Sequence, residues 1–426
     1  MTGTGLLLAA PTSASGKTTV TLAIARALSN AGQPVAAAKS GPDYIDPAFH
    51  AAATGAPCIT LDAFAMSPAR LKSLAATNGL RLIEGAMGLF DGAPPHGKGS
   101  AAQLAKTLGI PVILVVNAAS LAQSIAPLVN GFTTHDPDLT IAGIILNNTG
   151  SPRHERMLRA ALPGDIPLLG CFPRNPALKR PSRHLGLVQA SEDPRLETFL
   201  EAAAAQAAEH LDLAAIAAAA TPLRAPENSS PSKPLGQRIA IARDAAFAFA
   251  YPHMLADWHA QGASLHPFSP LADEAPDPSA DAIFLPGGYP ELHAQALARA
   301  GTFRGAMTAA AKRQTTIYGE CGGYMALGQS ITDKRGIPYP MCGLLALQTS
   351  FAKRKLHLGY RRLTPLSGPF ISAQMGHEFH YATTLSAEGA PLFAACDAEG
   401  HELGEIGLVS GSVSGSFAHV ITPASH

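Results

Sequence analysis

The sequence predicts an α/β protein of two domains, and three observations support this. The chain has 426 residues, more than one hydrophobic core usually holds. Short apolar runs alternate with helix-length segments, which is typical of a parallel sheet covered by helices on both faces. A Pro- and Ser-rich stretch at 221–236 interrupts this pattern near the middle of the chain, and we interpret it as an interdomain linker.

The first half contains apolar runs that are typical of buried strands. Each run is too short for a helix, and a helix-length segment separates it from the next. An Ala-rich stretch at 195–220 predicts a helix before the linker. The predicted strands are 5–10, 34–39, 80–84, 111–117 and 141–147, with 167–170 as one further candidate.

Strands resume after the linker, so a second α/β domain is expected there. Its predicted strands are 238–242, 282–286 and 315–317. The predicted organisation is a first domain at 1–195, a helix and linker at 196–236, and a second domain at 237–426.

Composition argues against several classes of function. Lys and Arg together number 31, as do Asp and Glu, so the net charge is zero and no basic field attracts nucleic acid. The five cysteines are odd in number and lack CxxC spacing, which argues against a disulfide framework and a zinc site. The apolar run 6–10 is too short for a signal peptide or a membrane span, so we expect a cytoplasmic protein.

A phosphate-binding loop is predicted where the first strand meets the first helix. The segment is Ala10-Pro-Thr-Ser-Ala-Ser-Gly-Lys-Thr-Thr19, with proline where the motif usually has its first glycine. Backbone N–H groups at such a helix start bind phosphates, the lysine reaches the terminal phosphates, and the following hydroxyl binds Mg²⁺. The alternative is an ordinary turn before a capped helix. The predicted ATP-binding residues are Ser15, Gly16, Lys17, Thr18 and Thr19.

Acidic segments follow the second and third predicted strands. They are Gly41-Pro-Asp-Tyr-Ile-Asp-Pro47 and Glu84-Gly-Ala-Met-Gly-Leu-Phe-Asp-Gly92. Loops after parallel strands gather at one edge of the sheet, so these carboxylates are expected to face Lys17. Carboxylates beside a triphosphate need Mg²⁺ between them, because like charges repel. Each of these acids could instead cap a helix or stabilise a turn. The candidates are Asp43, Asp46, Glu84 and Asp91.

A glycine-flanked cysteine is the strongest catalytic signal. Tyr318-Gly-Glu-Cys-Gly-Gly-Tyr324 follows a predicted strand and precedes an apolar, helix-prone run. Strand, tight turn and helix form the context in which a nucleophile is held exposed. A helix that starts just past the sulfur is expected to lower the pKa of the thiol. The sequence therefore predicts a thioester-forming nucleophile at Cys321.

Two further segments supply candidate partners for this thiol. Gly287 and Gly288 end a predicted strand, and their N–H groups could form an oxyanion hole. His419, after a glycine-rich turn, is a candidate base. His377 and His380 form a second polar cluster, but on a strand their rings would point to opposite faces, so a substrate-contacting segment is favoured over a metal pair.

Six segments in one order make the chain resemble the cobyrinate/hydrogenobyrinate a,c-diamide synthases of corrinoid biosynthesis. The resemblance runs nearly end to end, and its most specific carrier is Gly41-Pro-Asp-Tyr-Ile-Asp-Pro47. The six segments are 10–19, 41–50, 84–91, 285–291, 318–325 and 376–380.

That resemblance implies a fold and a reaction. The first half should be similar to dethiobiotin synthetase and the second to a class I glutamine amidotransferase. Two corrin carboxylates would become amides through acyl phosphates, with L-glutamine and MgATP consumed for each. Cys321 matches the nucleophile and His419 its activating histidine, while Thr18, Glu84 and Asp43 would hold Mg²⁺. The residues expected near the substrate or the transferred phosphoryl group are Asp43, Tyr44, Asp46, Glu84, Asp91, His377 and His380.

One departure and several alternatives stay open. Many amidotransferases carry a glutamate two residues past the histidine, where this chain has Ile421, so His419 must be oriented in another way. Amidation of other corrin carboxylates, as by cobyric acid synthase, is one alternative. A regulatory ATPase with an inactive amidotransferase module is another. Whether the ring contains cobalt is also open, with hydrogenobyrinate favoured, and a homodimer is one candidate oligomeric state.

Overall fold

The computed structural model describes residues 3–162, 164–178, 189–223 and 229–425. The chain divides into two compact units, Met1–Ser229 and Ser230–His426. Among the described helices, none has both the length and the apolar character needed to cross a membrane.

The first unit is built on one sheet with the strand order β3-β2-β4-β1-β5-β6-β7, and each neighbouring pair in this order is parallel. The short strand β8 pairs with β1 antiparallel. The strands are β1 (Thr4–Ala9), β2 (Val35–Ser40), β3 (Ile59–Leu61), β4 (Leu80–Glu84), β5 (Val112–Asn117), β6 (Ile141–Thr149), β7 (Leu168–Pro173) and β8 (Thr221–Pro222).

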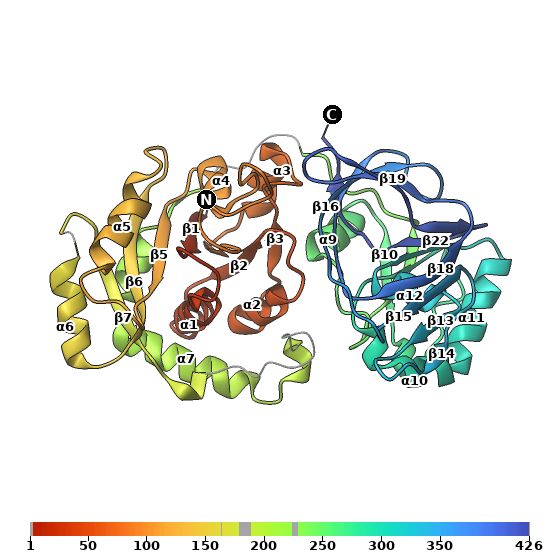
Figure 1. The fold of residues 1–426 in the computed structure, drawn as a ribbon, viewed down its shortest axis with the longest axis horizontal. Helices are drawn as coiled ribbons and strands as arrows, with labels where there is room; N and C mark the ends of the chain where they lie inside the picture. The colour runs from red at the N-terminus through yellow and green to blue at the C-terminus, as the bar shows by residue number, and fades with distance from the viewer. Residues whose placement is uncertain (1–2, 163, 179–188, 224–228, 426) are drawn as a thin grey trace. The chain divides into compact units, whose positions relative to one another are not determined.

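Helices cover both faces of this sheet. From β1 the chain moves to one edge through β2 and β3, and it then returns through β4 to the other edge. Because crossovers between parallel strands are right-handed, the helices of these two passages lie on opposite faces (Figure 1). The helices are α1 (Lys17–Asn30), α2 (Asp46–Thr54), α3 (Pro68–Ala75), α4 (Ala101–Leu108), α5 (Ile125–Thr134), α6 (Pro152–Ala161), α7 (Leu196–His210) and α8 (Leu213–Ala218).

The predicted strands of the first half are all present within a few residues of their expected bounds. The helix predicted at 195–220 is two helices, because Leu211 is extended and the Asp212 side chain caps the start of α8. Helix α7 packs along α1 (Figure 1). Between these helices Arg26 forms ion pairs with Glu197 and Glu201. The stretch interpreted as the linker begins as β8, which adds to the first sheet.

The second unit contains a mainly parallel sheet in the order β10-β9-β11-β12-β22-β21. Two further sheets have the orders β14-β13-β15-β18 and β20-β19-β16-β17-β23. Their strands are mostly antiparallel, short and partly polar, and the sequence analysis did not predict them. The helices are α9 (Pro252–Ala260), α10 (Ala294–Arg299), α11 (Gly301–Lys312) and α12 (Gly322–Leu327).

The strands of the second unit position its candidate site. The cysteine segment lies between β12 and α12, and β23 begins at His419. The strands are β9 (Arg238–Ala242), β10 (Ser264–Phe268), β11 (Ala282–Leu285), β12 (Thr316–Glu320), β13 (Ser330–Thr332), β14 (Pro338–Pro340), β15 (Ala346–Ser350), β16 (His357–Pro365), β17 (Gln374–His380), β18 (Thr383–Glu388), β19 (Phe393–Cys396), β20 (Glu402–Ile406), β21 (Leu408–Ser410), β22 (Val413–Ser416) and β23 (His419–Pro423).

Candidate active sites

The predicted phosphate loop ends at Gly16, directly before α1. Gly16 has a φ of 82° and precedes Lys17, the first residue of the helix. A Cβ on Gly16 would lie 2.1 Å from Asn147 Nδ2, so a larger residue does not fit. The Asn147 amide donates a hydrogen bond of 2.8 Å to the carbonyl oxygen of Ser15, which fastens the loop to the end of β6. This hydrogen bond fixes the end of the loop at the start of α1, and the backbone N–H groups of a helix start can bind anions.

The side chains of Lys17 and Thr18 contact the segment after β4. Lys17 Nζ donates to the carbonyl oxygen of Met87 at 2.5 Å, and Thr18 Oγ1 donates to Glu84 Oε1 at 2.6 Å. Burial lowers the pKa of Lys17, although the Glu84 carboxylate opposes this. The sequence predicts that Glu84 faces Lys17, and in the structure the hydrogen bond of Glu84 to the loop comes from Thr18.

Glu84 is the centre of a buried charge cluster that the sequence analysis did not describe. Lys39 Nζ lies 3.0 Å from Glu84 Oε1, and His50 Nε2 lies 2.5 Å from Oε2. Burial favours the neutral acid, but Lys39 and His50 outweigh it and hold the pKa of Glu84 well below its usual range. The pKa of Lys39 is raised in turn, because the nearby carboxylates outweigh its burial. One sign of this cluster is visible in the sequence, because Lys39 places a charge at the end of the otherwise apolar run 34–39.

The acids of the loop after β2 lie in the same cluster. Asp46 Oδ2 is 2.8 Å and Asp43 Oδ2 is 3.9 Å from Lys39 Nζ. Asp43 Oδ1 also accepts the backbone N–H groups of Ile45 and Asp46, which closes a tight turn. Partial burial, together with the neighbouring Asp46, raises the pKa of Asp43 to about 6. Tyr44 is buried in this turn.

Asp91 has a more local contact. Its Oδ2 accepts the backbone N–H of Gly88 at 2.9 Å, and its charge also acts on Lys17. The structure therefore brings all four predicted acids to one end of the sheet. Asp91 stabilises the turn after β4, whereas Asp43 and Asp46 contact Lys39.

A cavity of about 640 Å³ opens beside the phosphate loop. This volume is in the range of small-molecule sites. No local sequence pattern predicts the cavity, because its walls come from the loop, from the end of β6 and from the segment after β7. The lining residues include Gly16, Thr19, Asn147, Phe172, Arg174 and Asn175.

In the second unit, Cys321 lies on a tight turn between β12 and α12. Its φ of 46° and ψ of −101° are rare for a residue with a side chain and indicate strain. A Cβ on Gly323 would lie 1.9 Å from the carbonyl oxygen of Leu285, and one on Gly322 would lie 2.8 Å from the N atom of Gly288. The glycines after the cysteine are therefore required for close packing of α12 against the end of β11.

The expected exposure and acidity of the thiol are wrong. Cys321 is 4% exposed, and burial raises its pKa above the usual value, with the Glu291 carboxylate adding to the effect. The Gly322 N–H lowers the pKa, as predicted for a helix start, but α12 is short and burial is the larger effect. In this structure Cys321 is therefore a neutral thiol at neutral pH.

His419 lies against Gly287 at the same end of the sheet. A Cβ on Gly287 would be 2.1 Å from His419 Cε1, so the ring packs on the bare backbone. His419 Nδ1 is 3.8 Å from Glu320 Oε2. Burial lowers the pKa of His419 to about 3, and the neighbouring imidazoles of His377 and His380 act in the same direction. The ring is therefore uncharged at neutral pH, and burial disfavours its protonated form.

Strand β17 passes beside both Cys321 and His419. The carbonyl oxygen of Phe379 is 4.0 Å from Cys321 Sγ, and His377 is the register partner of His419. His377 and His380 thus lie with the cysteine in the second unit. The acids with which they were grouped as substrate-contacting residues lie in the first unit.

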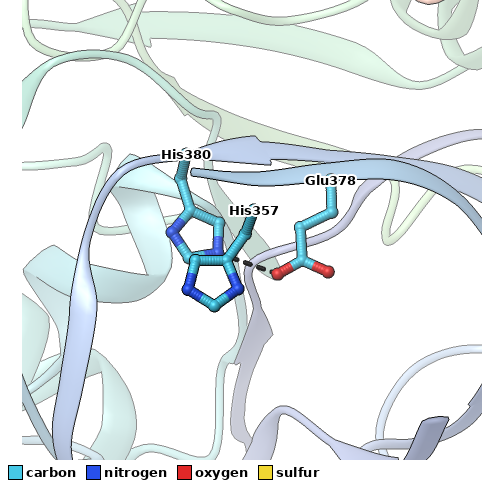
Figure 2. Close-up of side chains that lie close together, drawn as sticks. All are labelled: His357, Glu378 and His380. Atoms are coloured by element: carbon cyan, nitrogen blue, oxygen red, sulfur yellow. Dashed lines mark hydrogen bonds and ion pairs between the residues drawn. The ribbon is translucent and has the colours of Figure 1, made fainter. Parts of the chain in front are cut away.

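Figure 2 shows His380 and Glu378 of this strand with His357 of β16. Glu378 Oε1 is 2.8 Å from His380 Nε2, and Oε2 is 2.8 Å from Arg361 Nε. The rings of His357 and His380 are stacked, with centroids 4.6 Å apart and planes 5° apart. A metal ion lies in the plane of each imidazole that binds it, so these parallel rings cannot both bind one ion. The geometry fits a charge cluster beside Cys321.

Comparison with known proteins gives a matching family model for each half of the chain. Residues 6–188 match the CobQ/CobB/MinD/ParA nucleotide binding domain, and residues 238–426 match the CobB/CobQ-like glutamine amidotransferase domain. A hydrogenobyrinate a,c-diamide synthase from Brucella suis biovar 1 is 55% identical over 98% of both chains. The chain belongs to the hydrogenobyrinate a,c-diamide synthase family.

Other relatives with the same name extend the likeness. The protein from Rhizobium meliloti is 54% identical over 98% of this chain and 99% of its own. The one from Rhodobacter capsulatus is 49% identical over 98% of both. The predicted fold class and the predicted resemblance to the hydrogenobyrinate a,c-diamide synthase family are confirmed. The chain is a glutamine-dependent amidating ligase with a nucleotide-binding domain.

Proposed function

We propose that this protein converts hydrogenobyrinate to its a,c-diamide, with L-glutamine as the nitrogen donor and MgATP as the source of activation. One observation carries the proposal: a single chain holds a strained cysteine turn beside a buried neutral histidine, and also a phosphate loop beside a cavity of about 640 Å³. The names of the relatives favour the metal-free ring over its cobalt-containing counterpart.

The second unit releases ammonia from glutamine. Cys321 transfers its proton to His419 as the sulfur attacks the side-chain amide carbon, because a buried thiol with a raised pKa does not ionise beforehand. N–H groups of Gly287 and Gly288 stabilise the oxyanion, and one such donor is typically worth roughly 3–4 kcal/mol of barrier. The proton on His419 leaves with ammonia. Water then hydrolyses the thioester and releases glutamate.

The first unit activates the corrin carboxylate, which does not react with ammonia at neutral pH. An oxygen of the corrin carboxylate attacks the γ-phosphorus of ATP, so that an acyl phosphate forms and ADP leaves. Ammonia displaces phosphate from the acyl carbon and gives the amide. Lys17 leaves the carbonyl oxygen of Met87 and binds the phosphates, while the cavity beside Gly16 and Asn147 holds the nucleoside.

The residues beside the loop fit Mg²⁺. This ion prefers oxygen ligands and shields the charge of the transferred phosphoryl group. Thr18 supplies a hydroxyl, and Asp43 supplies a partly exposed carboxylate. Glu84 oxygens already contact Thr18, Lys39 and His50, so Glu84 orients Thr18 in addition to any contact with the ion.

The test compares two nitrogen sources. The purified protein is incubated with hydrogenobyrinate, ATP and Mg²⁺, with either glutamine or ammonium, and products are followed by mass spectrometry. Wild-type protein should form the a,c-diamide from both sources. Cys321→Ala should lose glutamine-dependent amidation and keep ammonium-dependent amidation. Full glutamine-dependent activity in that variant, or amides at other carboxylates, would contradict the proposal. A parallel reaction with cobyrinate tests the preference for the metal-free ring.

A further inference from the structure

We infer that Glu320 positions His419 and supplies the countercharge for its protonated form during glutamine hydrolysis. This role rests on the function proposed above for Cys321 and His419. It answers a question that the sequence left open, because residue 421 is isoleucine and not the glutamate that many amidotransferases carry there.

The contacts of Glu320 support this role. It is the last residue of β12, directly before Cys321, and it is 1% exposed. Its Oε2 is 3.8 Å from His419 Nδ1, an ion-pair distance somewhat longer than a hydrogen bond. Its Oε1 accepts the backbone N–H of Val420 at 3.0 Å. One carboxylate thus contacts both the ring of His419 and the backbone that follows it.

The surroundings favour Glu320 over other acids of the second unit. Position 421 holds Ile421, which is fully buried and whose carbonyl oxygen accepts a hydrogen bond from His253 Nε2. The Glu378 carboxylate raises the pKa of both Cys321 and His419, but its own oxygens contact Arg361 and His380. Among the described carboxyl groups, Glu320 is the one with an oxygen within 4 Å of a ring nitrogen of His419, and the backbone of Phe249 provides a further hydrogen bond to that ring.

The ionisation of Glu320 should make the rate of glutamine hydrolysis depend on pH. Burial raises the pKa of Glu320 to about 8, so near neutral pH much of Glu320 is uncharged, and above about pH 8 it is a carboxylate. Only the carboxylate stabilises the imidazolium that forms when His419 takes the proton of Cys321. Glutamine hydrolysis should therefore increase as pH rises through about 8. The other titratable groups around His419 and Glu320 are Tyr251, Tyr318, Cys321, His377, Glu378 and His380.

The experiment measures glutamate formation by the full chain with ATP, Mg²⁺ and hydrogenobyrinate between about pH 6 and pH 10. Above about pH 8, where wild-type Glu320 is a carboxylate, Glu320→Gln should lower kcat by about 10²–10⁴ and change the KM for glutamine by less than about threefold. It should also lose the increase near pH 8. Glu320→Asp keeps a carboxylate and should restore part of kcat and the increase with pH. Glu405→Gln, an exposed site on β20, is the matched control and should behave like wild type.

Two controls make the outcomes distinct. Ammonium-dependent amidation and the melting temperature show whether each variant is folded, and Glu320→Asp serves as the test if Glu320→Gln does not fold. A kcat within about threefold of wild type in Glu320→Gln, with the same increase near pH 8, would overturn the inference. If instead wild-type protein and Cys321→Ala form glutamate equally, the proposed function fails and not the role of Glu320 alone.

Discussion

The ammonium group of Lys17, at the start of α1, donates a hydrogen bond of 2.5 Å to the backbone carbonyl oxygen of Met87 in the segment after β4. Met87 has a φ of 49°, so its backbone adopts a strained conformation where this contact forms. Phosphate oxygens carry more charge than a carbonyl and compete for the same donor. Lys17 is thus held beside the site before the nucleotide binds.

Lys17→Met should remove ATP-dependent chemistry without removing glutamine hydrolysis. The substitution keeps the length of the side chain and deletes its charge, so amidation with ammonium should fall by about 10²–10³. Glutamate formation in the second unit should remain. Lys106→Met, at an exposed site on α4, is the control and should keep both activities. Ammonium-dependent amidation at the wild-type rate in Lys17→Met would contradict the assignment of this lysine.

Lys39→Met should strongly destabilise the first unit, because it leaves the buried Glu84 carboxylate without its closest lysine. Removing one partner of a buried ion pair typically costs about 3–5 kcal/mol. Lys106→Met removes an exposed partner of Asp136 and should cost about 0–1 kcal/mol. Urea unfolding followed for the first unit measures both. Equal losses in the two variants would show that the Lys39–Glu84 pair carries no special stability.

This pair also shows what sequence reasoning could reach. Lys17, Thr18 and Cys321 were predicted because each lies in a local strand–turn–helix pattern. The contact between Lys39 and Glu84 depends on β2 lying next to β4, where these two residues are register partners. That pairing joins strands that are not consecutive in the sequence, so no local pattern contains it. The cavity beside Gly16 was missed for the same reason.

The second unit shows a different limit. The turn at Cys321 was predicted from its glycines, but the state of the thiol was not. A helix start lowers a thiol pKa and burial raises it, and the sequence shows only the first effect. Burial by packed strands decides the outcome. The pair of Glu320 and His419 likewise exists only because β12 lies beside β22, which leads into β23.

Gly287→Ala should strongly reduce glutamine hydrolysis while the protein stays folded. The added Cβ would lie 2.1 Å from His419 Cε1, so the ring must move. A displaced base should lower kcat for glutamine by about 10²-fold or more, with ammonium-dependent amidation unchanged. Gly305→Ala on α11 has nothing within 4 Å of the new Cβ and is the matched control. It should keep full activity and gain about 0.5–1 kcal/mol of stability. Retained glutamine hydrolysis in Gly287→Ala would show that His419 does not need its position.

Acid should destabilise the second unit before most carboxylates protonate. Burial lowers the pKa of His377 from 6.5 to about 4, with the Arg361 charge adding to the effect. Between these values the unfolded chain binds a proton that the folded chain does not, so stability is present above about pH 6.5 and is lost as pH falls toward about 4. His377→Gln cannot titrate, and its free energy of unfolding should depend less on pH in this window. Urea unfolding at several pH values measures the slope, with the exposed His259→Gln as a control that keeps the wild-type slope. An unchanged slope in His377→Gln would mean that this ring is not neutral in the folded protein.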